Sequence, residues 1–219
     1  MTVEGYCGLF GSGKTYAMVM EVYNVRRRQP EMPIMTNLGR LDLPGVPVEY
    51  LSADVDLETM LAQLGAFRSG YLLLDEVGVY LPARVWSRMP VELSWKWQQL
   101  RKDGIELRWS CIRPNNVVKD LRDITFETHW CTSARRLGFF SVAHYSYTAV
   151  GDKKYFQSRS LMRFRPGLAG KLYDTMGKVK AAPFVTGRPV VKGVAVSGSV
   201  SEDVAVAVGP GSSSGLPTL

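Results

Sequence analysis

The sequence predicts an α/β protein with a mostly parallel central sheet flanked by helices, followed by a small C-terminal β-rich extension. Segments typical of strands and of helices alternate over residues 1–135, which is the pattern of parallel strands joined by crossover helices. A continuous apolar run at residues 71–74 is typical of a central strand that is buried on both faces. From residue 128 onward, aromatic and β-branched residues crowd together, which indicates a meander or hairpin added to this core.

The elements of the N-terminal half follow from apolar spacing and from turn residues. Residues 3–7 form a short apolar run that predicts the first strand. Residues 15–28 carry apolar side chains at helical spacing, and Pro30 prevents this helix from continuing. Residues 33–37 and 46–50 are predicted as short extended segments separated by a Gly/Pro turn. Residues 57–64 are predicted as a helix that Ser52 or Asp54 caps.

The C-terminal half gives a helix, a strand and a hairpin. A helix is predicted over residues 91–102, and Gly104 marks its end. A strand is predicted over 106–112, and Pro114 stops it. A short helix is expected at 118–122, and a hairpin from 139–147 and 155–164 with a turn at Gly151 and Asp152. We therefore expect a core at 1–135, a β-rich extension of the same domain at 136–180 and a flexible Gly-, Ser- and Val-rich tail at 181–219.

The bulk composition indicates a basic chain. Lysine and arginine total 27 against 20 acidic residues, which gives a net charge of +7 and a pI near 9.4. This excess is compatible with a nucleic acid or an anionic membrane surface as a partner, and an unspecialised basic surface is an equal alternative. No stretch approaches the roughly 18–20 apolar residues of a spanning helix, so we expect no transmembrane segment.

The three cysteines show no paired spacing, which favours a reducing compartment without disulfides. Cys131 stands two residues after His129. Two ligands do not make a zinc site, so no structural metal is expected.

A phosphate-binding loop, the Walker A motif, begins at Gly8. Residues 8–15 read Gly-Leu-Phe-Gly-Ser-Gly-Lys-Thr and fit G-x-x-x-x-G-K-[ST] without a mismatch. Glycines let backbone N–H groups turn toward phosphate oxygens, and the following helix points its positive dipole end at the same anion. Lys14 can reach the β- and γ-phosphates of ATP or GTP, and Thr15 can offer its hydroxyl to Mg²⁺. The residues expected to bind the nucleotide are Gly8, Gly11, Ser12, Gly13, Lys14 and Thr15.

Two carboxylates follow the apolar run at 71–74, as in a Walker B motif. Asp75 and Glu76 would lie at the C-terminal edge of the sheet, where open α/β folds bind ligands. We expect Asp75 to hold Mg²⁺, usually through water, and Glu76 to polarise the attacking water as general base. Glu76 directly after Asp75 favours nucleotide hydrolysis over phosphoryl transfer to a small metabolite, and Lys14 is expected to be the second catalytic residue. Two acids that merely end a strand in solvent are the alternative.

Other candidates carry weaker signals. A ring ATPase needs an arginine to neutralise the γ-phosphate, often from a neighbouring subunit. Sequence spacing does not choose among Arg84, Arg88, Arg101, Arg113, Arg122, Arg135 and Arg136. The pairs Arg101–Lys102 and Arg135–Arg136 fit either a phosphate-binding channel or solvated charge. Trp95 and Trp97 fit base stacking, although core or subunit packing is favoured on an amphipathic helix.

The order of several short motifs resembles one family. The phosphate-binding loop within the first fifteen residues is followed by a strand ending Thr36-Asn37 and by Leu-Leu-Leu-Asp-Glu at 72–76. Arg-Lys-Asp-Gly at 101–104, Leu-Arg at 121–122 and Leu-Tyr-Asp-Thr at 172–175 complete the set. Over roughly residues 1–178 the chain resembles the Zot (zonular occludens toxin) domain family. These are morphogenesis ATPases of filamentous bacteriophages and distant relatives of the FtsK–HerA DNA-pumping ATPases.

The resemblance implies a motor at the bacterial inner membrane, in which Lys14, Thr15, Asp75 and Glu76 match the ATP-site motif of the family. Such a motor hydrolyses ATP with Mg²⁺ and drives extrusion or packaging of single-stranded phage DNA with coat protein. It also implies a homo-oligomer, of which a hexameric ring is one form, and coat and membrane assembly proteins as partners. The expected location is the host cytoplasm, peripheral to the inner membrane.

Two departures from the family pattern are visible. Family members often have a sensor-like Gln late in the strand predicted at 106–112, where this chain has Ser110, and Ser110 or Asn115 are the possible substitutes. Family members also usually continue into a transmembrane helix, whereas this sequence ends in a polar, glycine-rich stretch.

Two other function classes stay open. A small-molecule kinase of the same fold is the first, although Glu76 beside Asp75 and the lack of an obvious Arg-rich lid argue against it. A non-catalytic scaffold, which holds DNA on its basic face and uses nucleotide only to order itself, is the second.

Overall fold

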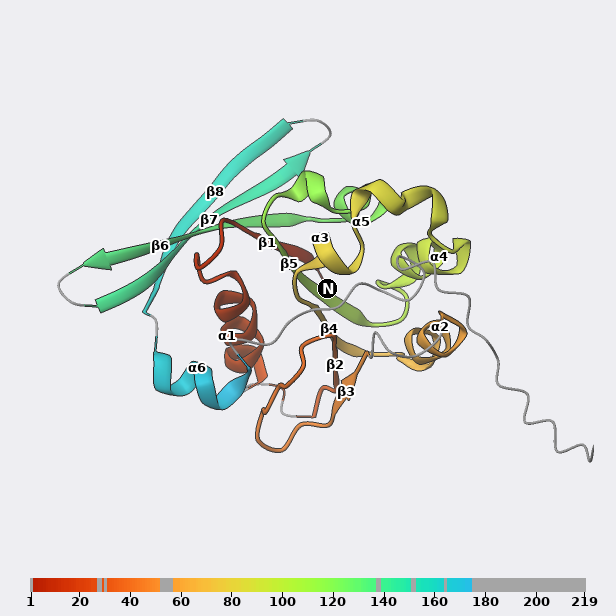
Figure 1. The fold of residues 1–219 in the computed structure, drawn as a ribbon, viewed down its shortest axis with the longest axis horizontal. Helices are drawn as coiled ribbons and strands as arrows, with labels where there is room; N and C mark the ends of the chain where they lie inside the picture. Colours follow the sequence, from red (N-terminus) through yellow and green to blue (C-terminus); the bar gives the residue numbers. More distant parts are fainter. Residues whose placement is uncertain are drawn as a thin grey trace, which may run out of the picture. The chain divides into compact units, whose positions relative to one another are not determined.

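The central feature of this chain, here a computed structural model, is one continuous sheet (Figure 1). The structure describes residues 2–26, 29, 31–51, 57–136, 139–150, 153–163 and 165–174. The chain divides into two units, Met1–Pro189 and Val190–Leu219, and every described residue belongs to the first. The predicted caps Ser52 and Asp54, the turn at Gly151 and Asp152, and the tail at 181–219 lie outside the described residues.

The sheet has eight strands in the order β3-β2-β4-β5-β1-β6-β7-β8. The first six strands of this order are parallel to one another, and β7 and β8 continue it in antiparallel fashion. In chain order they are β1 Val3–Cys7, β2 Ile34–Thr36, β3 Val48–Tyr50, β4 Gly70–Leu74, β5 Ile105–Cys111, β6 Glu127–Arg136, β7 Phe139–Val150 and β8 Lys153–Arg163. The predicted fold class is confirmed: a mostly parallel sheet with a β-rich extension.

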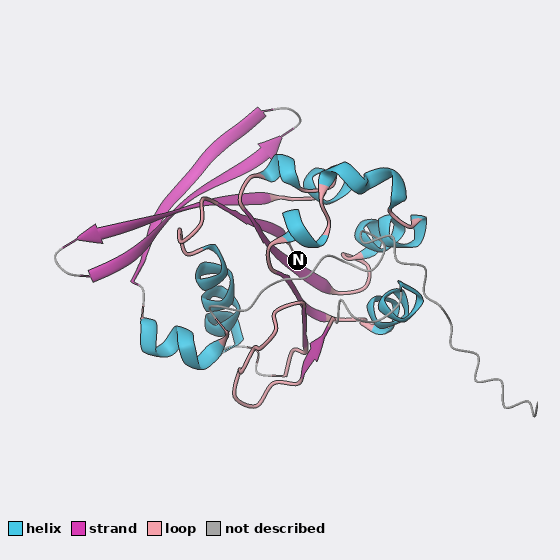
Figure 2. Cartoon of the chain, in the orientation of Figure 1, coloured by secondary structure: helices cyan, strands magenta, loops and turns pink. Residues whose placement is uncertain are grey.

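Helices cover both faces of the parallel part (Figures 1 and 2). The α-helices are α1 Lys14–Arg26, α2 Leu57–Ala66, α3 Val77–Tyr80, α4 Val91–Gln99, α5 Lys119–Asp123 and α6 Pro166–Leu172. Two 3₁₀ segments, η1 Ala83–Arg88 and η2 Pro114–Asn116, complete the set. Helices α1 and α6 lie on one face of the sheet, and α2 to α5 lie on the other (Figure 1).

The alternation of side chains along β4 explains why its sequence is apolar throughout. Tyr71 and Leu73 pack into the core layer that α1 covers. Leu72 and Leu74 pack into the opposite layer, with side chains from α2, α3, α4 and α5. A strand that is buried on both faces has no polar face to show in its sequence.

The helix boundaries differ from the predicted ones where the chain turns early. Helix α4 ends at Gln99 rather than near 102, because residues 100–104 already form turns and Gly104 adopts a positive φ of 76°. Helices α3 and α6 were not predicted, since four and seven residues are too few to show a helical period. Residues 27, 28 and 30, at the predicted end of the first helix, are not described.

Strand β6 links the predicted core to the predicted extension. Its first residues pair in parallel with β1, from Glu127 opposite Glu4 to Trp130 opposite Cys7. Its whole length pairs with β7 in antiparallel fashion. The extension therefore continues the sheet of the core. Within the described residues, no helix combines the length and the apolar composition needed to cross a membrane.

A buried ionic cluster lies across β1, β5 and α1. Arg108 on β5 is only 3% exposed, and its guanidinium contacts Glu21 at 2.9 Å, Glu106 at 3.0 Å and Glu4 at 3.2 Å. It also donates to the carbonyl oxygen of Thr2 at 2.9 Å. Burial raises the pKa of Glu21 even beside this cation. Arg108 is therefore the cation that the three carboxylates share.

Replacing Arg108 by leucine should lower the free energy of unfolding by about 3–5 kcal/mol at pH 7, because three carboxylates would be left without their cation. Urea unfolding of the full chain measures this change. Arg68→Leu is the matched control: its side chain is 77% exposed and pairs with Asp103 at 3.8 Å, so we expect little loss of stability. A loss below about 1 kcal/mol for Arg108→Leu would show that the cluster is not a structural centre.

Candidate nucleotide-binding site

The loop at residues 8–13 has a backbone that depends on glycine. Gly8, Gly11 and Gly13 have φ values of 152°, 70° and 85°, which L-residues with a side chain rarely adopt. A Cβ atom on Gly8 would also collide with the carbonyl oxygen of Cys131. The loop leaves the end of β1 and enters α1 at Lys14, so the N-terminus of a thirteen-residue helix closes the loop.

Two polar side chains of this loop face inward. The Ser12 hydroxyl oxygen is buried and has no hydrogen-bond partner among the described residues. Lys14 is 5% exposed, and its Nζ donates to the carbonyl oxygen of Leu9 at 3.2 Å. The same ammonium lies 3.6 Å from a carboxylate oxygen of Glu76. A buried hydroxyl without a partner and a buried ammonium two residues later in the sequence fit a phosphate, because phosphate oxygens would accept from both.

The Asp75 carboxylate is the meeting point of three elements. It is buried, and its Oδ1 accepts from the Thr15 hydroxyl at 2.8 Å and from the Ser110 hydroxyl at 2.5 Å. Thr15 comes from α1, Asp75 follows β4 and Ser110 comes from β5, which lies between β4 and β1. The structure thus brings together Thr15 and Asp75, the two residues that the sequence predicted as Mg²⁺ ligands.

Asn37 fixes the backbone at Asp75. Its side-chain amide donates to the Asp75 carbonyl oxygen at 2.9 Å, and its Oδ1 accepts from the Asp75 N–H at 2.7 Å. Asn37 follows β2, which pairs with β4, so the clamp joins two neighbouring strand ends. The sequence singled out Thr36-Asn37 only through the family resemblance. An amide at the end of a strand beside the Asp-Glu strand is the signal that could have found it.

Glu76 is held in a left-handed conformation, with φ 46° and ψ 48°. It is the one non-glycine residue with positive φ in the described part of the chain. Such a conformation is costly for a residue with a side chain and persists where the surroundings enforce it. Here the Glu76 N–H donates to the Ser110 hydroxyl at 3.1 Å, and the carboxylate reaches Lys14. The backbone turn is what places this carboxylate beside the loop.

Ser110 therefore contacts both acidic residues, through the Asp75 carboxylate and the Glu76 N–H. Of the two substitutes proposed for the family's sensor, Ser110 lies in the site. Asn115 instead accepts from Arg122 at 3.0 Å, in an exposed pair.

The donor set fits Mg²⁺ with a nucleotide phosphate. A carboxylate and a hydroxyl are the oxygen ligands that Mg²⁺ takes beside phosphates in sites of this kind. Burial raises the pKa of Asp75, although hydrogen bonds from Ser110 and Thr15 and the charge of Lys14 oppose the shift. Burial also raises the pKa of Glu76, against the opposing charge of Lys14. Both carboxylates are therefore electrostatically costly when ionised, and a cation would relieve this cost.

The arginine candidates whose side chains the structure describes lie outside this cluster of contacts. Arg122 pairs with Asn115, and the side chains of Arg135 and Arg136 are not described. The remaining candidates are exposed: Arg84, Arg88, Arg101 and Arg113. No single candidate is selected within the described residues.

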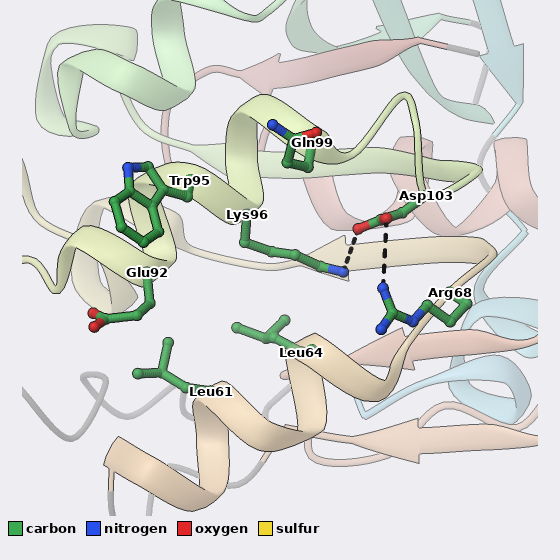
Figure 3. Close-up of a pocket in the computed structure, with 9 residues that line it drawn as sticks. Leu61, Leu64, Arg68, Glu92, Trp95, Lys96, Gln99 and Asp103 are labelled. Atoms are coloured by element: carbon green, nitrogen blue, oxygen red, sulfur yellow. Dashed lines mark hydrogen bonds and ion pairs between the residues drawn. The ribbon is translucent and has the colours of Figure 1, made fainter.

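The two tryptophans of α4 divide between core and surface. Trp97 is buried in the core layer of α2 to α5, whereas Trp95 is 60% exposed. Figure 3 shows Trp95 beside a hollow between α4 and α2. In the same hollow Asp103 accepts from Lys96 at 2.6 Å.

His129 and Cys131 do not form a joint metal site in the described structure. His129 Nε2 lies 3.0 Å from Glu4, and its ring stacks on Tyr6. The Cys131 thiol is buried, which raises its pKa to about 12, and it contacts the His129 carbonyl oxygen. Glu4, Glu21 and His129 do lie close enough to one another to offer ligand atoms, but Arg108 pairs with both of the glutamates. Cys7, Cys111 and Cys131 form no disulfide in the described structure, and the sulfurs of Cys7 and Cys111 lie 3.6 Å apart in a hydrogen bond.

Changing Asp75 to asparagine should stabilise the nucleotide-free protein at pH 7. The raised pKa means that the folded state binds a proton more tightly than the unfolded state does. The wild type therefore loses stability as the pH rises above the usual Asp range, near 3.9, toward the folded-state pKa. The asparagine side chain stays neutral and avoids this loss, so the gain should vanish at about pH 3.5, where the wild-type carboxyl is protonated as well.

Urea unfolding at the two pH values measures this difference, with Asp123→Asn at an exposed position as the control. A loss of stability for Asp75→Asn at pH 7 would mean that the hydrogen bonds to the ionised carboxylate outweigh its burial.

No protein-family model and no curated protein matches this sequence. Solved structures do match it. The N-terminal domain of zonular occludens toxin from Neisseria meningitidis aligns with a TM-score of 0.57 and 18% identity, over 79% of this chain and 98% of that one. The genome packaging NTPase B204 from Sulfolobus turreted icosahedral virus 2, solved with ATP-gammaS, aligns with a TM-score of 0.52 and 10% identity, over 74% of this chain and 96% of that one. The chain therefore has the P-loop NTPase fold that the N-terminal domain of zonular occludens toxin also has, which confirms the predicted resemblance at the level of the fold.

Proposed function

We propose that this chain is a Mg²⁺-dependent ATPase that drives extrusion or packaging of single-stranded DNA in the assembly of a filamentous phage. The observation that carries the proposal is the convergence of Lys14, Thr15 and Asp75 at the end of the loop, with Ser110 and Glu76 beside them. These residues come from three places in the sequence and meet at one edge of the sheet.

Binding is assigned to the loop and the start of α1. Backbone N–H groups of Gly11 and Gly13, with the Ser12 hydroxyl, hold the phosphate oxygens, and the α1 dipole favours the negative charge. Lys14 now pairs with Glu76 and the Leu9 carbonyl oxygen. We infer that it exchanges these partners for the β- and γ-phosphates, which frees the Glu76 carboxylate.

Catalysis is assigned to Glu76. Its carboxylate orients the attacking water and takes its proton, a role for which the pKa raised by burial is suited. Thr15 and Asp75 hold Mg²⁺, which when bound neutralises charge that develops on the phosphates. Ser110 positions both acids, since its hydroxyl bonds the Asp75 carboxylate and accepts from the Glu76 N–H.

Action on DNA is the less direct part of the proposal. A likeness in fold to a viral genome packaging NTPase supports it, as does the net charge of +7. Leu9 and Phe10, at the tip of the loop, are 66% and 79% exposed. Large apolar side chains beside a charged site favour a covering surface, so we propose a homo-oligomer in which a second copy supplies it. The motor would act at the host inner membrane with coat and membrane assembly proteins.

Changing Glu76 to glutamine should lower ATP turnover by about 10²–10⁴-fold, because the amide cannot take a proton from water. Binding of ATPγS should change little, since glutamine keeps the shape of the side chain. Phosphate release by the full chain with Mg·ATP and single-stranded DNA measures turnover. Calorimetry measures the binding of ATPγS.

Glu92→Gln, at an exposed position on α4, is the matched control and should keep wild-type turnover. Equal turnover in Glu76→Gln and wild type would reject Glu76 as the base. If the wild type binds ATPγS and single-stranded DNA but releases no phosphate, the scaffold function replaces the motor.

A further inference from the structure

The antiparallel part of the sheet has one face without a helix layer in the described structure. On β6, Cys131 is buried beneath α1, whereas Trp130 faces the other way and is 37% exposed. On β8, Phe156 is 58% exposed, and Arg159 is also exposed. Figure 1 shows β7 and β8 extending beyond the helices that cover the parallel strands. We call Thr128, Trp130, Thr132, Phe156 and Arg159 the outer face.

The strand register brings these residues onto one surface. Trp130 pairs with Tyr145, which pairs with Arg159; Thr128 pairs with Tyr147, which pairs with Phe156. Phe156 and Arg159 are three residues apart and would face opposite sides of a regular strand. On β7, Ser146 pairs with Ser158 and the next residue, Tyr147, pairs with Phe156, so β8 has one extra residue at this point. This bulge returns Phe156 and Arg159 to the same face.

The opposite face of the same strands is partly covered. Met162 on β8 packs against the core layer of α1, and the Tyr16 hydroxyl donates to the carbonyl oxygen of Arg163. The exposure of the outer face is therefore not shared by the whole extension. The end of β8 docks onto the nucleotide-binding core on this side, where Tyr155 further along the strand is still 48% exposed, and the outer face presents aromatic and cationic side chains.

The charge of the extension is mostly positive. Strands β6, β7 and β8 together carry six basic residues and one acidic residue, Glu127. Glu127 does not belong to the outer face, because its carboxylate lies 3.9 Å from the ring of His129, which stacks on Tyr6. An anionic partner would meet no opposing carboxylate from these three strands on the outer face.

We propose that the outer face binds single-stranded nucleic acid. Unpaired bases stack on aromatic side chains such as Trp130 and Phe156, and a guanidinium such as Arg159 contacts the backbone phosphates. Bases within a duplex are stacked on one another and unavailable to these rings, so the single strand is the form that the surface favours. This inference deepens the proposed function and rests on it, since it names the surface that holds the DNA.

The position of the outer face connects it to the nucleotide site. Trp130 pairs with Cys7, the last residue of β1 before the loop. The next residue of β6, Cys131, has its carbonyl oxygen in the space that a Cβ atom on Gly8 would fill. A shift of β6 on binding DNA would therefore act directly on the start of the phosphate-binding loop.

The test is fluorescence anisotropy of a labelled oligothymidylate of about 20 nucleotides, titrated with the full chain without ATP. Trp130→Ala and Phe156→Ala should each weaken binding by roughly tenfold, because each removes a stacking platform. Arg159→Gln should reduce the salt dependence, with a slope lower by about 0.7 in the logarithm of affinity. A duplex of the same length should bind more weakly at equal salt.

Tyr155→Ala is the matched control. Tyr155 is 48% exposed and adjacent to Phe156, but it pairs with Thr148 and Glu127 lies in the same row, so its removal should leave affinity unchanged. Equal losses for Tyr155→Ala and Phe156→Ala would overturn the proposal, as would equal or tighter binding of the duplex. Self-association of the chain that Phe156→Ala abolishes, without an effect on the oligonucleotide, would assign the face to a second copy and also overturn it.

The same experiment separates this inference from the ATPase proposal. Calorimetry with ATPγS reports on the loop and does not need the outer face. Oligonucleotide binding without ATPγS binding would uphold the outer face and reject the ATPase. ATPγS binding without oligonucleotide binding would reject the outer face and leave the nucleotide-binding site in place, with phosphate release then testing the ATPase. Thermal unfolding by circular dichroism confirms that each variant is folded, and an affinity loss in a folded Trp130→Ala or Phe156→Ala supports the assignment.

Discussion

The site depends on the buried carboxylate of Asp75. Its Oδ1 accepts hydroxyl hydrogen bonds from Thr15 on α1 and from Ser110 on β5. The strand order makes this possible, because β5, which contains Ser110, lies between β4, which precedes Asp75, and β1, which precedes the phosphate-binding loop. A carboxylate out of water is costly unless it is hydrogen-bonded or paired with a cation. The arrangement is therefore poised to accept a cation at the place where the loop would hold phosphates.

The order of the strands also explains which parts of the site the sequence could predict. The loop at 8–15 and the pair Asp75-Glu76 are local patterns, and their chemistry can be read from residue types alone. The role of Ser110 depends on β5 lying between two strands that are distant in the sequence, and no local pattern carries this information. The clamp by Asn37 depends in the same way on the pairing of β2 with β4.

The fold, like the site, has features that a local sequence pattern predicts and features that depend on tertiary contacts. The alternation of strands and helices, and the apolar run of β4, follow from the need to bury both faces of a parallel sheet. The left-handed turn at Glu76 could not be predicted, since glutamate has no preference for it and tertiary contacts enforce it. The periodicity of α4 did not distinguish Trp95 from Trp97, because the choice depends on where α2 packs. The dual pairing of β6, parallel on one side and antiparallel on the other, is likewise absent from its sequence.

The most direct test of the Asp75 account is a calorimetric titration of ATPγS into the full chain, with and without Mg²⁺, for the wild type and Asp75→Asn. If Asp75 holds the cation, Mg²⁺ strengthens binding to the wild type, and this enhancement is lost in Asp75→Asn while binding without Mg²⁺ persists. An equal Mg²⁺ enhancement in both proteins would contradict the account.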